Sequence, residues 1–230
     1  MAGGTASPNR RRAGDRPKGD PSCRLERSLA RRGYRAVAGL DEVGRGSWAG
    51  PLVAAAVILP RPTPSVLAKL RGVRDSKQLL AAQRERLFAA IHDVALSTGI
   101  GLVSAPTIDL LGLSAAGQLA LERAARALSV VPDYLLIDAF ALPGLDCPQE
   151  AIIFGDARCL SIAAASVIAK VERDRLLARL ALEYPAFGFE RNKGYGTAEH
   201  RRVLACLGPT SQHRFGYAPV RAVLGGGCAC

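Results

Sequence analysis

Residues 36–59 read AVAGLDEVGRGSWAGPLVAAAVIL and hold two apolar runs, 36–41 and 51–59, on either side of a glycine-rich turn. Short apolar runs that are bounded by Gly and Pro are typical of buried strands. The first run ends on two adjacent acids, Asp41 and Glu42. This stretch therefore predicts two buried strands, with carboxylates at the end of the first.

Amphipathic helices alternate with further apolar strands along the rest of the chain. We predict helices over 23–32, 77–96, 107–128, 159–183 and 198–207, a short helix after Pro219, and strands over 99–104, 133–138 and 151–154. Strands that alternate with helices indicate an α/β fold in which helices pack against a sheet. The pattern does not determine the order of the strands.

Positive charge is concentrated at the start of this 230-residue chain. Residues 1–35 hold ten Lys and Arg against three Asp and Glu, whereas the remainder holds 21 against 17, within a net charge of +11. We expect residues 1–21 to form a disordered basic tail and 225–230 a flexible tail. Two interpretations of the basic tail stay open: non-specific binding of nucleic acid through counterion release, or a solvated arm that aids solubility.

The cysteines and the apolar runs argue against several classes of protein. None of the six cysteines forms a Cys-x-x-Cys pair, and Cys228 and Cys230 follow three glycines in the predicted flexible tail. The N-terminus has no apolar stretch typical of a secretory signal, and no apolar run is long enough to span a bilayer. We expect a cytosolic protein with free thiols and no membrane partner.

Four acids follow apolar strands, where an unpaired carboxylate is costly. They are Asp41, Glu42, Asp138 and Asp156. If the strands are neighbours, these carboxylates converge at one edge of the sheet, and their repulsion raises their pKa values unless cations neutralise them. Mg²⁺ prefers oxygen ligands, and two such ions about 4 Å apart can promote phosphodiester hydrolysis.

Each element of this constellation also has a simpler interpretation. Adjacent strand residues point to opposite faces, so Asp41 and Glu42 can share a site only if the strand ends there, which Gly44 and Gly46 permit. Asp156 could cap the helix that follows it. The Gly44-Arg45-Gly46 segment alone could be any tight turn or a phosphate loop, although the Walker and Rossmann patterns are absent.

The motifs as a set are more specific than any one of them. Residues 39–57 read GLDEVGRGSWAGPLVAAAV, and further blocks are DSKQL (75–79), Asp138, GDAR (155–158), SIAAASVIAKVERDR (161–175), NKGYGT (192–197), His200 and His213-Arg214. In this order, over about residues 34–224, the chain closely resembles the ribonuclease HII family, the bacterial type 2 ribonucleases H. Two departures stand out: Phe154 replaces a usual lysine, and a serine usual near His213-Arg214 is missing.

The resemblance implies a fold and a chemistry. The fold is RNase H-like: an α/β structure with a mixed central sheet flanked by helices and a helical C-terminal portion. The catalytic domain would span 22–224, with about 186–224 as its substrate-binding portion. Asp41, Glu42, Asp138 and Asp156 would be both the catalytic residues and the ligands of Mg²⁺ or Mn²⁺. The enzyme would cut 5′ of ribonucleotides, in RNA/DNA hybrids and at single ribonucleotides in duplex DNA, leaving 3′-hydroxyl and 5′-phosphate ends.

The resemblance also implies residues that bind the substrate. The backbone of Gly44, Arg45 and Gly46 would contact the ribose 2′-hydroxyl, the group that distinguishes RNA from DNA. Tyr195 would stack near the deoxyribose that follows, unless it is simply a core or loop aromatic. The remaining candidates are Ser76 and Lys77 at a helix N-terminus, and Lys170, which could contact phosphate or pair with Asp174 four residues on. Arg158, His200, His213 and Arg214 could contact phosphate or stabilise the C-terminal region.

Three other functions remain to be weighed against this nuclease. They are a catalytically silent hybrid-binding protein, a nucleotide-binding enzyme that uses Gly44–Gly46 as a phosphate loop, and a ribonuclease HIII, whose large N-terminal domain has no counterpart in the short tail here. For the leading hypothesis we expect a monomer that acts on RNA/DNA hybrids and ribonucleotide-containing DNA, in excision repair and replication. A sliding-clamp contact is not readable from the sequence.

Overall fold

The computed structural model describes residues 19–225. The predicted tails, 1–21 and 225–230, therefore lie almost entirely outside the described residues, as do Cys228 and Cys230. No helix of the described part is long and apolar enough to cross a membrane.

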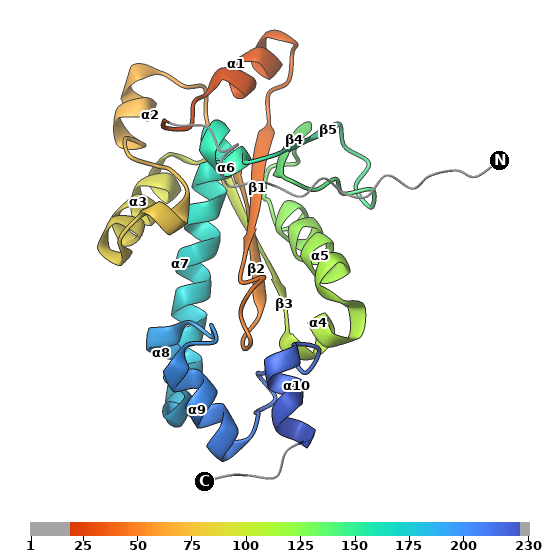
Figure 1. The fold of residues 1–230 in the computed structure, drawn as a ribbon. Coiled ribbons are helices and arrows are strands. Elements are labelled where there is room, and N and C mark those ends of the chain that lie inside the picture. Colours follow the sequence, from red (N-terminus) through yellow and green to blue (C-terminus); the bar gives the residue numbers. More distant parts are fainter. Residues whose placement is uncertain (1–18, 226–230) are drawn as a thin grey trace, which may run out of the picture.

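A five-stranded mixed sheet forms the centre of the fold (Figure 1). Its strands are β1 (Val37–Val43), β2 (Leu52–Ile58), β3 (Ser97–Val103), β4 (Tyr134–Asp138) and β5 (Gln149–Ile152), in the order β3-β2-β1-β4-β5. The first three strands pair antiparallel, whereas β4 runs parallel to both β1 and β5. The predicted α/β fold with a mixed sheet is confirmed, and the parallel half brings the ends of β1 and β4 to one edge.

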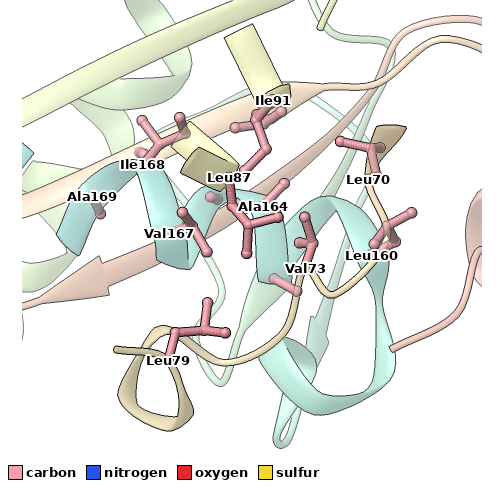
Figure 2. Close-up of a cluster of buried hydrophobic side chains, with 14 of the residues drawn as sticks. Leu70, Val73, Leu79, Leu87, Ile91, Leu160, Ala164, Val167, Ile168 and Ala169 are labelled. Atoms are coloured by element: carbon pink, nitrogen blue, oxygen red, sulfur yellow. The ribbon is translucent and has the colours of Figure 1, made fainter. Parts of the chain in front are cut away.

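Helices cover both faces of the sheet. On one face α7 (Leu160–Glu183) packs on β1 and β2, with α3 (Ala81–Val94) behind it, and on the other face α5 (Leu113–Arg126) packs on β2 and β3. The shorter elements are α1 (Arg24–Arg31), α2 (Pro64–Lys69), the 3-10 turn η2 (Ser76–Gln78), α4 (Ala105–Leu111) and α6 (Gly155–Arg158). Figure 2 shows the apolar cluster in which Leu87 and Ile91 of α3 meet Val167 and Ile168 of α7.

The C-terminal elements gather around the far end of α7. They are the 3-10 turn η3 (Pro185–Phe187), α8 (Phe189–Asn192), α9 (Ala198–Leu207) and α10 (Ala218–Gly225). Phe189, Leu204 and Val220 bury their side chains against Leu177 of α7 and Trp48 of the β1–β2 loop. A small second core therefore holds the C-terminal portion against that loop.

Small residues let the helices come close to the sheet. A Cβ on Gly39 of β1 would lie 2.2 Å from the carbonyl carbon of Ser161 in α7. A Cβ on Gly101 of β3 would lie 1.9 Å from the carbonyl oxygen of Ala120 in α5. These distances are far below van der Waals contact, so the backbones pack directly on each other at both positions.

Several predicted boundaries were wrong, for local reasons. The predicted helix 77–96 is divided into η2 and α3, and the predicted helix 107–128 is divided at Gly112, whose φ of 77° ends α4. The prediction omitted α2, which the Thr63 side chain caps by accepting from the Val66 amide at 3.3 Å. β5 ends at Ile152 instead of residue 154, because Phe154 adopts a left-handed conformation with φ of 56°.

Candidate active site

Three of the four predicted acids lie at one edge of the sheet. The parallel pairing aligns Leu40 of β1 with Ile137 of β4, so the residues that follow them, Asp41 and Asp138, are neighbours across the two strands. Asp156 lies in the first turn of α6, directly after β5. The amide of Gly155 donates to Oδ1 of Asp138 at 2.8 Å and ties the start of α6 to the end of β4.

The charges of these acids affect the pKa values of Asp41 and Lys77. Asp41 is only 5 % exposed, and its burial raises its pKa well above the ordinary value, with further contributions from the charges of Asp138, Glu42 and Asp156. Burial disfavours the charged form of Lys77, but Asp41 and three neighbouring Asp side chains outweigh it and raise the pKa of Lys77. Lys77 therefore faces the carboxylates, and the edge of the sheet is a place where added positive charge is favourable.

Glu42 lies on the other face of the sheet. The prediction that the strand ends beside Asp41 and Glu42 was wrong, because β1 continues through Val43 and keeps the alternation of its side chains. The Glu42 carboxylate pairs with Nη1 of Arg45 at 3.5 Å, on the side of α5. Within residues 19–225, no group of three or more His, Cys, Asp and Glu side chains is arranged to hold a metal ion.

The donor chemistry of the site nevertheless suits a hard divalent cation. All four side chains offer carboxylate oxygens, the ligands that Mg²⁺ and Mn²⁺ take in proteins. Burial first, and then the charges of neighbouring carboxylates, raise the pKa of Asp41, and a bound cation would favour its charged form. Metal ligation by the four acids accordingly stays a prediction, and for Glu42 it requires that the pair with Arg45 opens.

The Gly44–Gly46 turn lies between the acids and Tyr195. Gly44 has φ of 95°, and a Cβ on it would lie 2.3 Å from Nε of Arg173, so this position requires glycine. A Cβ on Gly46 would lie 3.9 Å from the ring of Tyr195, which places the turn beside that tyrosine. The Arg45 guanidinium turns back over the ring of Phe140, at 4.9 Å, so the backbone of the turn and not the Arg45 charge is next to Tyr195.

Two buried arginines hold this turn in place. Arg173 of α7 donates to the carbonyls of Pro51, Lys193 and Ala49 at 3.0, 2.9 and 3.2 Å. Arg214 donates to the Gly44 carbonyl at 2.7 Å and to the Gly50 carbonyl at 3.1 and 2.9 Å. Their residues are 1 % and 0 % exposed, so stabilisation is the interpretation of Arg214 that the structure supports. Arg173 is not among the residues predicted from the sequence, because its partners are backbone carbonyls, which residue spacing does not reveal.

A buried histidine pair, His200 and His213, supports the backbone of Tyr195. Nδ1 of His200 donates to the Tyr195 carbonyl at 2.9 Å, and the Thr210 amide donates to Nδ1 of His213 at 3.0 Å. His213 therefore carries its proton on Nε2 and donates it to Nε2 of His200, 3.0 Å away. Burial lowers the pKa of both rings, to about 4 for His213. The pair is neutral at pH 7 and supports the backbone of Tyr195, a residue that is 40 % exposed.

The other candidate residues have structural contacts. Ser76 is fully buried, and its hydroxyl lies 2.9 Å from that of Ser166, which fastens η2 to α7. Lys170 pairs with Asp174 at 2.6 Å, as the i,i+4 interpretation predicts. Arg158 is exposed near α6. Contacts of these residues with phosphate stay a prediction, and Ser76 is the least accessible for one.

The comparison with known proteins decides which family has this site. Residues 38–220 match the family described as Ribonuclease HII. This chain belongs to the ribonuclease HII family. The ribonuclease HII of Chloroflexus aurantiacus is 51% identical over 203 residues, which are 87% of this chain and 94% of that protein. The ribonuclease HII of Bacillus subtilis is 49% identical over 197 residues, which are 86% of this chain and 75% of that protein.

Solved structures agree with this assignment. The ribonuclease H2 of Pyrococcus horikoshii superposes with a TM-score of 0.64 at 29% identity, over 81% of this chain and 96% of that one. The RNase HII of Archaeoglobus fulgidus, solved in a complex with PCNA, has a TM-score of 0.64 at 28% identity, over 79% of this chain and 95% of that one. Bst-RNase HIII, solved with Mn²⁺, is 23% identical and shows the shared fold, with a TM-score of 0.61.

Family membership establishes the class of activity. Ribonucleases H are hydrolases that act as endonucleases, and this chain is an enzyme of that class. The RNase H-like fold that the sequence predicted is confirmed. Membership argues against the nucleotide-binding and catalytically silent alternatives, and the match to ribonuclease HII relatives at about half identity argues against ribonuclease HIII.

Proposed function

We propose that this enzyme hydrolyses the phosphodiester bond on the 5′ side of ribonucleotides, both in RNA/DNA hybrids and at single ribonucleotides within duplex DNA. The products would carry 3′-hydroxyl and 5′-phosphate ends. One relationship supports the proposal above all. Burial and the charges of Asp138, Glu42 and Asp156 raise the pKa of Asp41 near the end of β1, and the Gly44–Gly46 turn that follows β1 lies beside Tyr195. Groups suited to catalysis and to sugar recognition are therefore adjacent.

Asp41, Glu42, Asp138 and Asp156 would hold the Mg²⁺ or Mn²⁺ ions. Bound divalent ions would supply an activated water and charge that stabilises the leaving 3′ oxygen. Lys77 would offset the negative charge of the carboxylates before substrate arrives, consistent with its raised pKa. The Gly155 amide would keep the Asp138 carboxylate oriented through the bond that it donates to Oδ1.

The Gly44–Gly46 backbone and Tyr195 would read the junction between ribonucleotide and deoxyribonucleotide. A turn whose arginine side chain folds away can present its backbone amides and carbonyls to a 2′-hydroxyl. Tyr195, an exposed residue, would pack on the next sugar, where a second 2′-hydroxyl is absent. The C-terminal portion, about 186–224, would thus bind substrate through a tyrosine whose backbone His200 supports.

Cleavage of a DNA duplex with one embedded ribonucleotide tests the proposal. We expect a single cut 5′ of the ribonucleotide with Mg²⁺ or Mn²⁺ and none in EDTA. Asp138→Asn should lower the rate by roughly 10³-fold or more while duplex affinity stays within a few-fold, because removing a metal ligand affects chemistry before binding. Asp146→Asn, at an exposed position between β4 and β5, is the matched control and should keep full activity. Equal rates for Asp138→Asn and the wild type would refute the assignment.

The cellular setting is part of the same proposal. The enzyme would act as a monomer in the cytosol, in ribonucleotide excision repair and replication. The Archaeoglobus fulgidus relative was solved with PCNA, which supports a test for binding to a sliding clamp. Light scattering of the purified chain, alone and with a clamp protein, would report both the oligomeric state and this contact.

A further inference from the structure

A basic hollow lies outside the site described above, between α2 and α3. It measures about 490 Å³. Lys69, Arg71, Arg74 and Arg86 line it together with Gln78 and Gln83, and no carboxylate is among its lining residues. Figure 1 shows α2 and α3 side by side, and the buried Leu79 and Leu87 form the apolar floor of the hollow.

The positive charge of this hollow is not a general property of the enzyme. Most of the net charge of +11 belongs to the first 35 residues, and the remaining chain is close to balanced. The four cations that line the hollow, with no acid among the lining residues, are therefore a local concentration of positive charge. Lys69 and Arg74 pair with Asp93 and Asp20 across exposed contacts of 2.6 and 3.3 Å, which contribute little in water.

Arg71 and Arg86 are the cations most available to a ligand. Both are exposed, and neither has an ion pair with any other residue of the described part. The acid next to Arg86, Glu85, points away toward Arg175 of α7, at 2.7 Å. The hollow thus presents two free guanidinium groups and two amides, a combination that suits phosphate oxygens.

The hollow and the active site take neighbouring residues from η2. Gln78 lines the hollow, while its neighbour Lys77 in the same three-residue turn lies in the field of Asp41 and Asp138. The buried bond between Ser76 and Ser166 fixes η2 on α7, so the two places keep a constant separation. A duplex bound at the carboxylates would therefore have the hollow on the adjoining surface, one residue further along η2.

We propose that this basic hollow binds backbone phosphates of the duplex flanking the ribonucleotide, within about one helical turn of 10 base pairs from the scissile bond. The inference rests on the proposed function, because it extends the same substrate beyond the active site. Phosphate contacts position a duplex without reading its sequence. The hollow would therefore contribute to affinity and not to the choice between ribonucleotide and deoxyribonucleotide.

The test is binding of an all-DNA duplex without divalent ions, over a range of salt concentrations. Arg71→Gln combined with Arg86→Gln should lower the slope of log K against log salt by about 2 and weaken binding roughly 10- to 100-fold near 0.1 M salt. Arg27→Gln combined with Arg31→Gln removes two exposed charges from α1 and is the matched control. A slope equal to that of this control would overturn the proposal.

Shortening the duplex on one side separates the hollow from general electrostatics. The duplex is shortened on one side of the ribonucleotide or on the other, so that the ribonucleotide lies near one end. The binding defect of the Arg71 and Arg86 variant should vanish for one of these two truncations and persist for the other. A defect that is the same for both truncations would overturn the proposal. Because plain DNA binding needs no cleavage, a wild-type enzyme that binds through the hollow but does not cut would refute the proposed function alone.

Discussion

Arg214 donates through Nη1 to the carbonyl of Gly44 at 2.7 Å, across 170 residues of sequence. This bond joins the C-terminal portion to the turn that follows β1. Arg173 adds a second attachment from α7, and both guanidinium groups are buried among backbone carbonyls. Burial lowers the pKa of Arg173 to about 10, so the group is still charged at neutral pH, and the carbonyl dipoles satisfy its donors.

Arg173→Lys should disturb substrate recognition while the protein still folds. Lysine keeps the charge but cannot serve three carbonyls in the planar geometry of a guanidinium. We expect a loss of about 1–3 kcal/mol in stability and at least about a tenfold fall in kcat/KM, with a changed ratio of rates on embedded ribonucleotides and on hybrids. Arg175→Lys, at an exposed position two residues on in the same helix, should change neither quantity. An unchanged substrate ratio in Arg173→Lys would argue against a positioning role.

Asp41→Asn should stabilise the enzyme in the absence of divalent ions. The pKa of Asp41 is higher in the folded state than in the unfolded state. The stability that the protonated carboxyl permits is therefore fully present below the unfolded pKa. It is lost as the pH rises through the folded pKa. At pH 7 with a chelator, the variant should therefore melt higher, by about 2–4 °C for each kcal/mol relieved. Mn²⁺ should raise the Tm of the wild type and have much less effect on the variant. A lower Tm for the variant in chelator would contradict this account.

The histidine pair should make the enzyme sensitive to mild acid. The pKa of His213 falls from about 6.5 in the unfolded chain to about 4 in the folded protein. The neutral ring therefore contributes its full share to the free energy of unfolding above about pH 6.5. This share is lost as the pH falls from 6.5 to about 4. The loss is on the order of 3 kcal/mol. Urea unfolding at several pH values measures it.

Two variants separate this pair from other acid effects. The variant that combines His200→Gln with His213→Gln should be less stable at pH 7. Its free energy of unfolding should depend less on pH between pH 6.5 and 4. His92→Gln, at an exposed ring on α3, should keep most of the wild-type slope. If the double variant and the wild type lose stability in parallel, the pair does not cause the acid sensitivity.

Gly101→Ala should be among the most damaging small substitutions. Its Cβ would lie 1.9 Å from the Ala120 carbonyl oxygen, so α5 must move away from β3 and loosen the second face of the sheet. We expect a loss of about 3 kcal/mol or more in urea unfolding. Gly46→Ala, whose Cβ meets only the Tyr195 ring at 3.9 Å, is the matched control and should stay within about 0.5 kcal/mol. Similar losses in both variants would contradict the close-packing explanation.

Apolar periodicity was sufficient to predict the five strands and the long helix α7, because burial imposes a repeat that can be read locally. The same reading placed Asp41, Asp138 and Asp156 after strands, and the sheet brings these three together. It did not divide the helix at Gly112, because apolar periodicity continues through a glycine whose positive φ ends α4. It could not extend β1 past Glu42, since that end depends on the pairing of β1 with β2. The orientation of Glu42 toward Arg45 follows from that extension.

Residue types and their order along the chain were enough to identify the family and to select the acids, because a carboxylate beside a buried strand is costly wherever it occurs. Folding in three dimensions was needed to give Arg173, Arg214 and the His200–His213 pair their roles. Arg173 and Arg214 bind backbone carbonyls 122 and 170 residues away in sequence, and the two histidine rings, 13 residues apart, meet only because the C-terminal portion folds back. Backbone carbonyls are the same at every residue, so the pattern of side chains does not predict which carbonyl will accept a hydrogen bond from a buried donor.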